Sequence, residues 1–256
     1  MAKKSLGQHF LFDPAIISRI VDASGVTADD TVVEIGPGPG AMTRILAFRA
    51  KRLIAIELDD ELYMRLLAEF ENVAKVELHH ADALKFDFAS IGLPFKVVAN
   101  IPYYITTPLI FALMDAKPLL RSMTLTIQKE VAARIVAKPG SKDYGVLSLS
   151  VQYFADARLE FIVPASAFRP VPKVDSAVIR IDVLEKPAVQ VSDEALFFRI
   201  VRAGFSQRRK TLANALKPLF PDIRQVIIGA EIDPVRRAET LSMEEFARLA
   251  DEVGRI

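Results

Sequence analysis

The sequence predicts an α/β fold in which an open, mostly parallel sheet carries helices on both faces and has an antiparallel end, followed by a small all-helical domain. Three observations predict it. Short β-branched runs alternate with helix-period segments from residue 31 to residue 138, and a glycine-rich turn at residues 36–40 follows the first of these runs. Beyond Tyr144 the pattern changes to strand-like runs and then to helical periodicity. We expect a sheet domain over residues 1–185 and a helical domain over residues 186–256.

The first part of the chain shows the alternation most clearly. Asp13-Pro14 has the form of a helix cap followed by proline at the first helical position, and it predicts a helix to about residue 24. Further helices are expected from residue 41 and over residues 60–70, 106–116 and 129–138, and strands over residues 31–35, 52–57, 75–79, 95–99 and 123–128.

The rest of the chain is expected to complete the sheet and then leave it. Residues 146–154, 157–163 and 174–183 resemble strands, which would close the sheet with antiparallel pairing. Residues 185–188 have the composition of a linker. Residues 193–256 show helical periodicity interrupted by prolines, so we expect the second domain to consist of helices alone.

The composition excludes several classes of protein. Among 256 residues there is no cysteine and there are three histidines, so disulfides and thiolate sites are absent and no metal-ligand spacing is visible. The sequence also shows no apolar run of the roughly 20 residues that cross a membrane. We therefore expect a cytoplasmic protein without a metal, working without a membrane.

A net charge of +1 conceals a local excess of positive charge in the second domain. The segment 199–217 contains six cations and no acid, which suits contact with RNA phosphates better than an ordinary solvated helix face. The cations are Arg199, Arg202, Arg208, Arg209, Lys210 and Lys217.

The glycine turn and two acids indicate a nucleoside-bearing ligand. Gly36 and Gly38 would let the backbone approach a ligand closely, and Glu57, at the end of the next strand, would suit a ribose. A nicotinamide cofactor fits these residues loosely. Asp82 after the third strand could reach an adenine amine, and no partner for hydride transfer is evident, so S-adenosylmethionine fits better.

The segment Asn100-Ile101-Pro102-Tyr103 follows the fourth expected strand. The exocyclic amine of adenine is a poor nucleophile because its lone pair is delocalised into the ring. Acceptors aimed at its N–H groups would localise that pair, and the Asn100 side-chain carbonyl and the Ile101 backbone carbonyl are the candidates. Tyr103 could stack on the base after the base is turned out. We expect Asn100 to contact the cofactor as well.

Five segments together resemble one family, the ribosomal RNA small-subunit adenine N6,N6-dimethyltransferases (KsgA family), over nearly the whole chain. The segments are residues 4–11 (KSLGQHFL), 34–40 (EIGPGPG), 100–103 (NIPY), 168–174 (FRPVPKV) and 205–212 (FSQRRKTL).

The resemblance implies a Rossmann-like methyltransferase fold that uses S-adenosyl-L-methionine and releases S-adenosyl-L-homocysteine. It implies dimethylation of two adjacent adenosines in the 3′-terminal hairpin loop of 16S rRNA, the small ribosomal subunit as partner, and a role in its biogenesis. Cofactor contacts for His9 and Leu11 follow, although many members carry asparagine at the position of His9. Phe168 resembles the family aromatic that faces Tyr103 across the target base. An enzyme that works on so large a partner has no evident need to self-associate, so we expect a monomer.

Two other readings remain open from the sequence. The large-subunit rRNA methyltransferases of the macrolide-resistance type share the glycine turn and the Asn-Ile-Pro-Tyr type of motif, but the segment 205–212 favours the small-subunit group. A non-catalytic RNA-binding assembly factor on the same fold is the second, and the presence of Asn100, Glu57 and Asp82 argues against lost catalysis.

Overall fold

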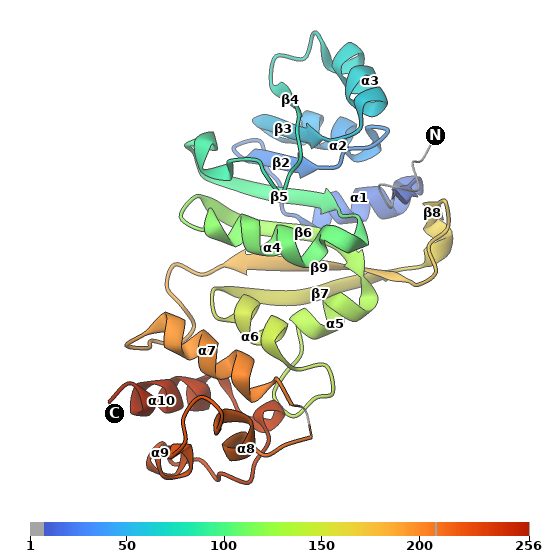
Figure 1. Cartoon of the computed structure of the whole chain (residues 1–256). Coiled ribbons are helices and arrows are strands. Elements are labelled where there is room, and N and C mark those ends of the chain that lie inside the picture. The colour runs from blue at the N-terminus through green and yellow to red at the C-terminus, as the bar shows by residue number, and fades with distance from the viewer. Residues whose placement is uncertain (1–7, 208, 256) are drawn as a thin grey trace. The chain divides into compact units, whose positions relative to one another are not determined.

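The computed structural model (Figure 1) describes residues 8–207 and 209–255. By contact density the chain divides into two compact units. The first comprises the chain up to Ala132 together with Arg158–Val183, and the second comprises Ala133–Ala157 and Leu184–Ile256. The chain passes from the first unit to the second for the last time after Val183, two residues before the boundary that the sequence predicts at residue 185. Residues 133–157, however, group with the helical unit and not with the sheet.

A seven-stranded sheet in the order β4-β3-β2-β5-β6-β9-β7 forms the centre of the first unit. Parallel pairing joins β2, β3, β4, β5 and β6, and β9 is antiparallel to β6, which confirms the expected antiparallel end. The strands are β2 (Thr31–Ile35), β3 (Arg52–Glu57), β4 (Val76–His80), β5 (Phe95–Asn100), β6 (Leu120–Gln128), β7 (Ala155–Val163) and β9 (Ser176–Val183).

The strand order reverses at β2. The chain builds outward from β2 through β3 to β4 and then returns to the other side of β2 as β5. In an open parallel sheet the connections at such a reversal leave in opposite directions, so a crevice forms at the carboxyl ends of the two strands. The crevice here lies between the end of β2 at Ile35 and the end of β5 at Asn100.

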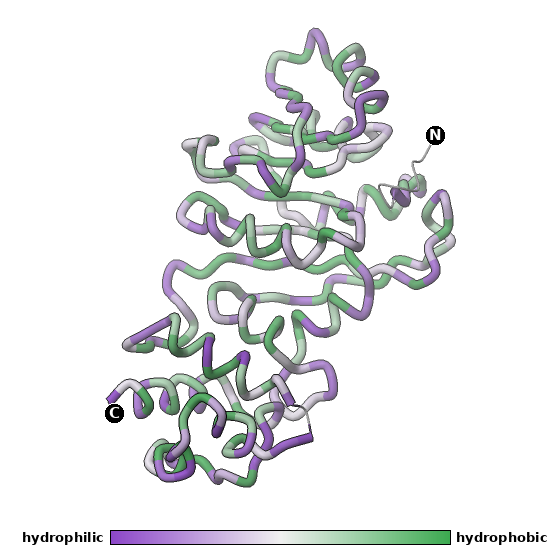
Figure 2. The backbone as a smooth tube through the Cα atoms, in the orientation of Figure 1, coloured by the Kyte–Doolittle hydropathy of each residue, from purple (hydrophilic) through white to green (hydrophobic). Residues whose placement is uncertain are grey.

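Helices cover both faces of the sheet: α4 lies in front of the strands in Figure 1 and α1 behind them. The helices of this unit are α1 (Pro14–Ala23), α2 (Ala41–Arg49), α3 (Asp60–Phe70) and α4 (Thr106–Asp115), and α5 (Lys129–Ile135) leads out of it. The Asp13 carboxylate caps α1 by accepting from Ala15 N at 2.9 Å, as the sequence predicts. The central strands are largely hydrophobic along their length (Figure 2), because both of their faces are buried.

One core cluster shows how this packing positions the loops. Ile20 of α1, Leu46 of α2 and Leu53 of β3 are all fully buried and belong to a single cluster. Burial of side chains of this kind stabilises the fold by roughly 1.5–3 kcal/mol each. The loops at the carboxyl ends of the strands therefore leave a rigid support.

The second unit is helical, as predicted, with a core of its own around Phe197, Leu212 and Phe246, which are fully buried. Its helices are α6 (Val146–Gln152), α7 (Glu194–Gly204), α8 (Leu212–Leu216), α9 (Ile223–Gly229) and α10 (Met243–Val253). In the described part of the chain, no helix has both the length and the apolar character needed to cross a membrane.

The expected strand over residues 146–154 is wrong, because Val146–Gln152 forms the helix α6. Its serines alternate with apolar residues, which is the pattern of a half-buried strand. The structure instead buries Ser148, whose hydroxyl accepts from Gly145 N and donates to Arg134 O. Because both hydrogen bonds of its hydroxyl are made, Ser148 can be buried beside Leu149. The alternation of serine with apolar residues therefore does not mark one exposed and one buried face here.

A two-stranded antiparallel ribbon was not predicted either. Strand β1 (Phe10–Leu11) pairs with β8 (Phe168–Arg169), with Leu11 opposite Phe168. The ribbon brings a segment near the N-terminus beside a loop some 157 positions later in the sequence, and both segments border the crevice.

Candidate active site

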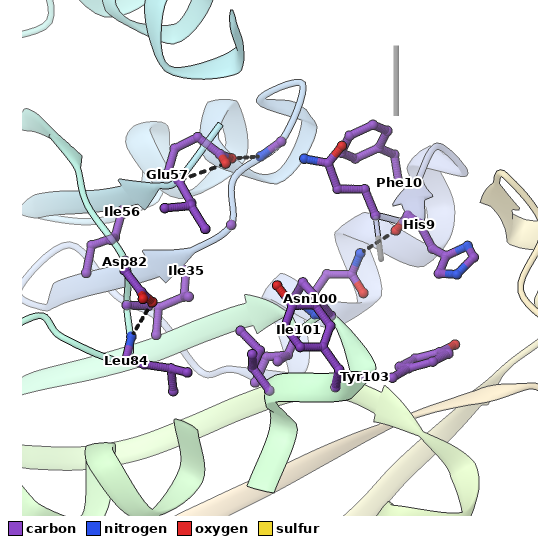
Figure 3. Close-up of a pocket in the computed structure, with 18 of the residues that line it drawn as sticks. His9, Phe10, Ile35, Ile56, Glu57, Asp82, Leu84, Asn100, Ile101 and Tyr103 are labelled. Atoms are coloured by element: carbon purple, nitrogen blue, oxygen red, sulfur yellow. Dashed lines mark hydrogen bonds between the residues drawn. The ribbon is translucent and has the colours of Figure 1, made fainter. Parts of the chain in front are cut away.

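A cavity of about 170 Å³ lies at the carboxyl ends of β2, β3 and β5 (Figure 3). Ten residues that the sequence singled out line it, from six separate stretches of the chain: His9, Gly36, Gly38, Glu57, Asp82, Asn100, Ile101, Pro102, Tyr103 and Phe168. The predicted residue Leu11 lines a smaller adjoining cavity of about 30 Å³ instead.

The glycine turn after β2 adopts a backbone conformation that other residues tolerate poorly. Gly36 and Gly38 have φ values of +66° and +58°. A Cβ atom on Gly38 would lie 3.0 Å from the ring of Phe10, closer than normal packing allows. The turn thus presents bare backbone to the cavity, as expected of a loop that cradles a ligand.

Glu57 supports the glycine turn as well as bordering the cavity. Its buried carboxylate accepts hydrogen bonds from the backbone N–H groups of Gly38 at 3.0 Å and of Leu58 and Asp59 at 2.9 Å each. Burial raises the pKa of Glu57, and these three hydrogen bonds oppose the rise. Because a carboxylate has about four acceptor positions, one remains for a ligand hydroxyl.

Asp82 stands in the turn that follows β4. Its Oδ1 accepts from Leu84 N at 2.9 Å, which fixes the side chain in a tight turn on the cavity wall. Among residues 8–207 and 209–255 no donor reaches Oδ2. That oxygen is an acceptor suited to an exocyclic amine.

Asn100 ends β5 with its amide held in one orientation. Its Nδ2 donates to the backbone carbonyl of His9 at 3.0 Å (Figure 3), which leaves the side-chain carbonyl Oδ1 as an acceptor. Ile101 extends the strand by one more hydrogen bond, from its N–H to Thr126 O at 3.1 Å. Both residues are thus fixed by main-chain partners at the place where the crevice opens.

Tyr103 is held at its hydroxyl and at one face. The hydroxyl shares a hydrogen bond with Ser176 Oγ at 2.8 Å, and the imidazole of His9 stacks on the ring at a centroid distance of 5.8 Å. Burial raises the pKa of Tyr103, so the hydroxyl stays protonated at neutral pH. The His9 imidazole in turn contacts Pro170 O through Nδ1 at 2.7 Å.

Phe168 borders the cavity but is only 1% exposed. It belongs to the same core cluster as Leu11, its partner in the ribbon. The ring therefore forms part of the packed core behind the cavity wall in this structure. Its stacking on a target base stays a prediction.

Glu34 is a residue that sequence reasoning missed. It is fully buried in β2, and within the described residues no hydrogen bond reaches either of its carboxyl oxygens. Burial, reinforced by the negative charge of Glu57 and opposed by the hydroxyl of Thr43, raises the pKa of Glu34 to about 8. A glutamate inside a β-branched strand was the available signal, since ionisable residues seldom occupy such positions.

The predicted RNA-binding cations belong to the second unit. Arg199, Arg202, Arg209 and Lys210 are exposed, and none of the four forms an ion pair with an acid in the described part of the chain. Arg208 lies outside the described residues, as do residues 4–7 of the N-terminal motif.

The first unit thus presents a bare-backbone turn, two acids on successive strands, and an amide carbonyl beside an aromatic ring. The turn and acids suit a ligand with a ribose and an adenine amine. The carbonyl acceptors beside an aromatic ring suit a second flat ring that bears an amine.

Comparison with known proteins gives consistent results. The family model of the ribosomal RNA adenine dimethylases matches residues 1–254. "Ribosomal RNA small subunit methyltransferase A" of Clostridium acetobutylicum is 48% identical, with 98% of this chain and 94% of the relative covered. The protein of that name from Clostridium perfringens strain 13 is 49% identical, with coverages of 98% and 90%.

Two solved structures share the fold over almost the whole chain. A dimethyladenosine transferase from Plasmodium falciparum has a TM-score of 0.82 and 28% identity, covering 96% of this chain and 98% of its own. The 23S rRNA methyltransferase ErmE has a TM-score of 0.77 and 26% identity, covering 96% and 99%.

Proposed function

Because the chain belongs to the ribosomal RNA adenine dimethylase family, we propose that it dimethylates N6 of two adjacent adenosines in the 3′-terminal hairpin loop of 16S rRNA. The protein is a methyltransferase that acts on ribosomal RNA. The orientation of the Asn100 amide is the observation that carries the proposal, since it provides the acceptor that the chemistry requires.

S-adenosylmethionine fits the residues that the cavity brings together. The bare backbone at Gly36 and Gly38 leaves room for a closely held ligand, Glu57 keeps one acceptor position for a ribose hydroxyl, and Asp82 Oδ2 is available to an adenine amine. Leu11 would contribute from the adjoining cavity. The bound cofactor supplies an electrophilic methyl group on a sulfonium centre.

Asn100 and Ile101 act on the target amine. With Nδ2 committed to His9 O, the Asn100 side chain can accept from the amine only through Oδ1, and the Ile101 carbonyl would accept from the second N–H. Two such hydrogen bonds concentrate the lone pair on N6 and orient it. Fixed acceptors of this kind need no reorganisation during the reaction, which is why positioning and electrostatics can carry the rate.

Tyr103 holds the target base. Its ring is fixed through Ser176 and is partly exposed, so an extruded adenine can stack on it. Stacking of one base on an aromatic side chain contributes roughly 1–3 kcal/mol. A loop adenine is easier to extrude than a paired one, which suits a hairpin loop as the target.

The small subunit is the proposed partner because the two Clostridium relatives, 48% and 49% identical over nearly the full length, bear the small-subunit name. The likeness to ErmE is only 26% in sequence. The exposed cations Arg199, Arg202, Arg209 and Lys210 would bind rRNA phosphates. Such an enzyme would work as a monomer in the bacterial cytoplasm, where small subunits are assembled.

Transfer of labelled methyl groups to undermethylated small subunits, followed by nucleoside analysis, tests the proposal. We expect N6,N6-dimethyladenosine in the 3′-terminal hairpin. In Asn100→Ala the turnover number should fall by at least 100-fold, since a fixed electrostatic contact of this type contributes roughly 10²–10³ in rate.

Asn72→Ala is the matched control because Asn72 is exposed and does not line the cavity. Full activity in Asn100→Ala would remove the amide from the mechanism. Large subunits are supplied in a parallel reaction, and label found only in their rRNA would instead favour the activity named for ErmE.

A further inference from the structure

We propose that His80 is a positioning residue for the cofactor, because its imidazole fastens the turn after Glu57 to the strand that leads to Asp82. The inference rests on the proposed function, in which these two acids hold the ribose and the adenine amine of S-adenosylmethionine. His80 itself does not line the cavity. It would act through the two acids, which border one cavity from neighbouring segments of the chain (Figure 3).

The backbone places His80 beside Glu57. His80 is the last residue of β4 and lies directly opposite Glu57, the last residue of β3, in the parallel ladder. The next residue, Ala81, donates its backbone N–H to Glu57 O at 3.0 Å, and Asp82 follows it. The two acids thus belong to adjoining strand ends. The distance between them depends on how the turns after these strands are held.

The imidazole of His80 reaches across this ladder to the turn between β3 and α3. Its Nε2 atom lies 3.3 Å from Leu58 O and 2.9 Å from Asp60 Oδ1. A carbonyl and a carboxylate are both acceptors, so Nε2 must carry a hydrogen, as it does in the neutral Nε2–H tautomer and in the imidazolium alike. The ring also stacks on Tyr63 of α3 at a centroid distance of 4.8 Å. Three contacts therefore hold this one side chain against the turn and the helix that follows it.

Leu58 is the residue of the turn that these contacts control. Its N–H donates to the Glu57 carboxylate at 2.9 Å, and within the described residues His80 is the only hydrogen-bond donor that reaches its carbonyl. The Leu58 side chain is 46% exposed and lines the cavity. Without the imidazole, Leu58 would be held on its N–H side alone, and the Glu57 carboxylate would lose part of its orientation toward a ligand.

The contact between His80 and Asp60 has little value as a stabilising ion pair. The two side chains are 42% and 81% exposed, and exposed pairs of this kind contribute little to folding. Its effect should therefore appear in cofactor affinity more than in stability. His80 also lies outside the hydrophobic core of the first unit, so variants at this position should fold.

The experiment compares His80→Ala and His80→Gln with the unaltered protein. Calorimetry gives the Kd for S-adenosylmethionine and for S-adenosylhomocysteine, urea denaturation gives the free energy of unfolding, and methylation of undermethylated small subunits at saturating cofactor gives kcat. In His80→Ala we expect both Kd values to rise by roughly three- to tenfold, the equivalent of one lost hydrogen bond. The two should rise together because the ligands share their nucleoside half. The value of kcat should stay within about twofold, since a change in uniform binding leaves the chemical step unaltered.

His80→Gln tests whether the hydrogen bonds are the cause. The amide nitrogen of glutamine can take the place of Nε2 as a donor, whereas the ring that stacks on Tyr63 is lost. We expect this variant to restore most of the affinity for both ligands. Equal losses in His80→Ala and His80→Gln would show that donation to the turn does not position the site, and would overturn the inference.

Glu77→Ala is the matched control. Glu77 also lies on β4, accepts from Arg52 of β3 at 2.6 and 2.7 Å, and does not line the cavity. This variant therefore removes a side-chain contact between the same two strands, near the opposite end of their ladder. It should lower the free energy of unfolding at least as much as His80→Ala and leave both Kd values unchanged. Unchanged Kd values in His80→Ala, or the same rise in Glu77→Ala, would overturn the inference.

The proposed function and this inference fail in different ways. If the unaltered protein dimethylates small subunits and His80→Ala binds the cofactor with the same Kd, only the role of His80 is refuted. If the unaltered protein binds no S-adenosylmethionine, or if Glu57→Ala binds it as tightly as the unaltered protein does, the proposed use of the acids fails. The inference then fails with it, because His80 has no site to position.

Discussion

Glu34→Gln should make the protein more stable at alkaline pH. Glu34 is fully buried in β2, two residues before Gly36, and within the described residues its carboxyl oxygens have no hydrogen-bond partner. Burial raises the pKa of this carboxyl from 4.5 to about 8, so the folded protein holds the proton to a higher pH than the unfolded chain does. Between these two values the folded state binds more protons, and its stability must therefore fall as the pH rises.

The size of the effect follows from the shift in pKa. One pKa unit corresponds to about 1.4 kcal/mol, so the stability attributable to Glu34 should decrease by about 3–4 kcal/mol between pH 5 and pH 9. The decrease should be steepest across neutral pH and should level off above the folded-state pKa of about 8. Because the side chain is fully buried, solvent does not screen the effect.

Urea denaturation at pH 5, 7 and 9 measures it. Other groups titrate over this range, so the informative quantity is the difference between the unaltered protein and Glu34→Gln at each pH. Relative to the unaltered protein, the free energy of unfolding of Glu34→Gln should increase by about 3–4 kcal/mol from pH 5 to pH 9. Glu71→Gln, at an exposed position, provides the control. Parallel stability curves for the unaltered protein and Glu34→Gln would refute a protonated buried carboxyl.

Two further predictions concern the ligand sites. Gly38→Ala places a Cβ at a φ of +58° and 3.0 Å from the Phe10 ring, so the free energy of unfolding should fall by about 1–2 kcal/mol and cofactor binding measured by calorimetry should weaken; unchanged affinity would show that the turn does not shape the site. Arg209→Glu with Lys210→Glu should weaken binding to small subunits and flatten its dependence on salt, whereas cofactor affinity should stay the same. A binding isotherm with the original salt slope would contradict a phosphate contact for this pair.

The sequence predicts the parallel core of the fold well because local and long-range preferences agree there. The run 31–35 is mostly β-branched, ends at a glycine turn and pairs with two other strands of the same kind. Its local preference and its position in the sheet therefore both favour a strand. Parallel pairing then brings Gly36, Glu57 and Asn100 to one edge, because the carboxyl ends of parallel strands meet. That is why these residues could be grouped from their places in the sequence alone.

Features that depend on distant partners were not predictable in the same way. Glu34 lies in a strand whose neighbours bury it completely. The sequence alone does not indicate this burial, and so it does not indicate that the carboxyl keeps its proton. The helix α6 contradicts its own alternating pattern because Arg134, outside that helix, supplies the acceptor that lets Ser148 be buried. Burial by neighbouring strands decides the state of Glu34, and a hydrogen bond to a residue outside the helix decides that of Ser148; no local rule connects either to its segment.

The ribbon of β1 and β8 extends this reasoning to the site itself. Two of the segments that carry the family resemblance, one near the N-terminus and one around Phe168, contain no local signal for pairing, yet they form a ladder with each other. That ladder holds His9 where its carbonyl meets the Asn100 amide and its ring meets Tyr103. The orientation of Asn100, on which methyl transfer would depend, is therefore set by a residue 91 positions away. A change that weakens the ribbon should for this reason lower the turnover number without altering any residue that touches the target base.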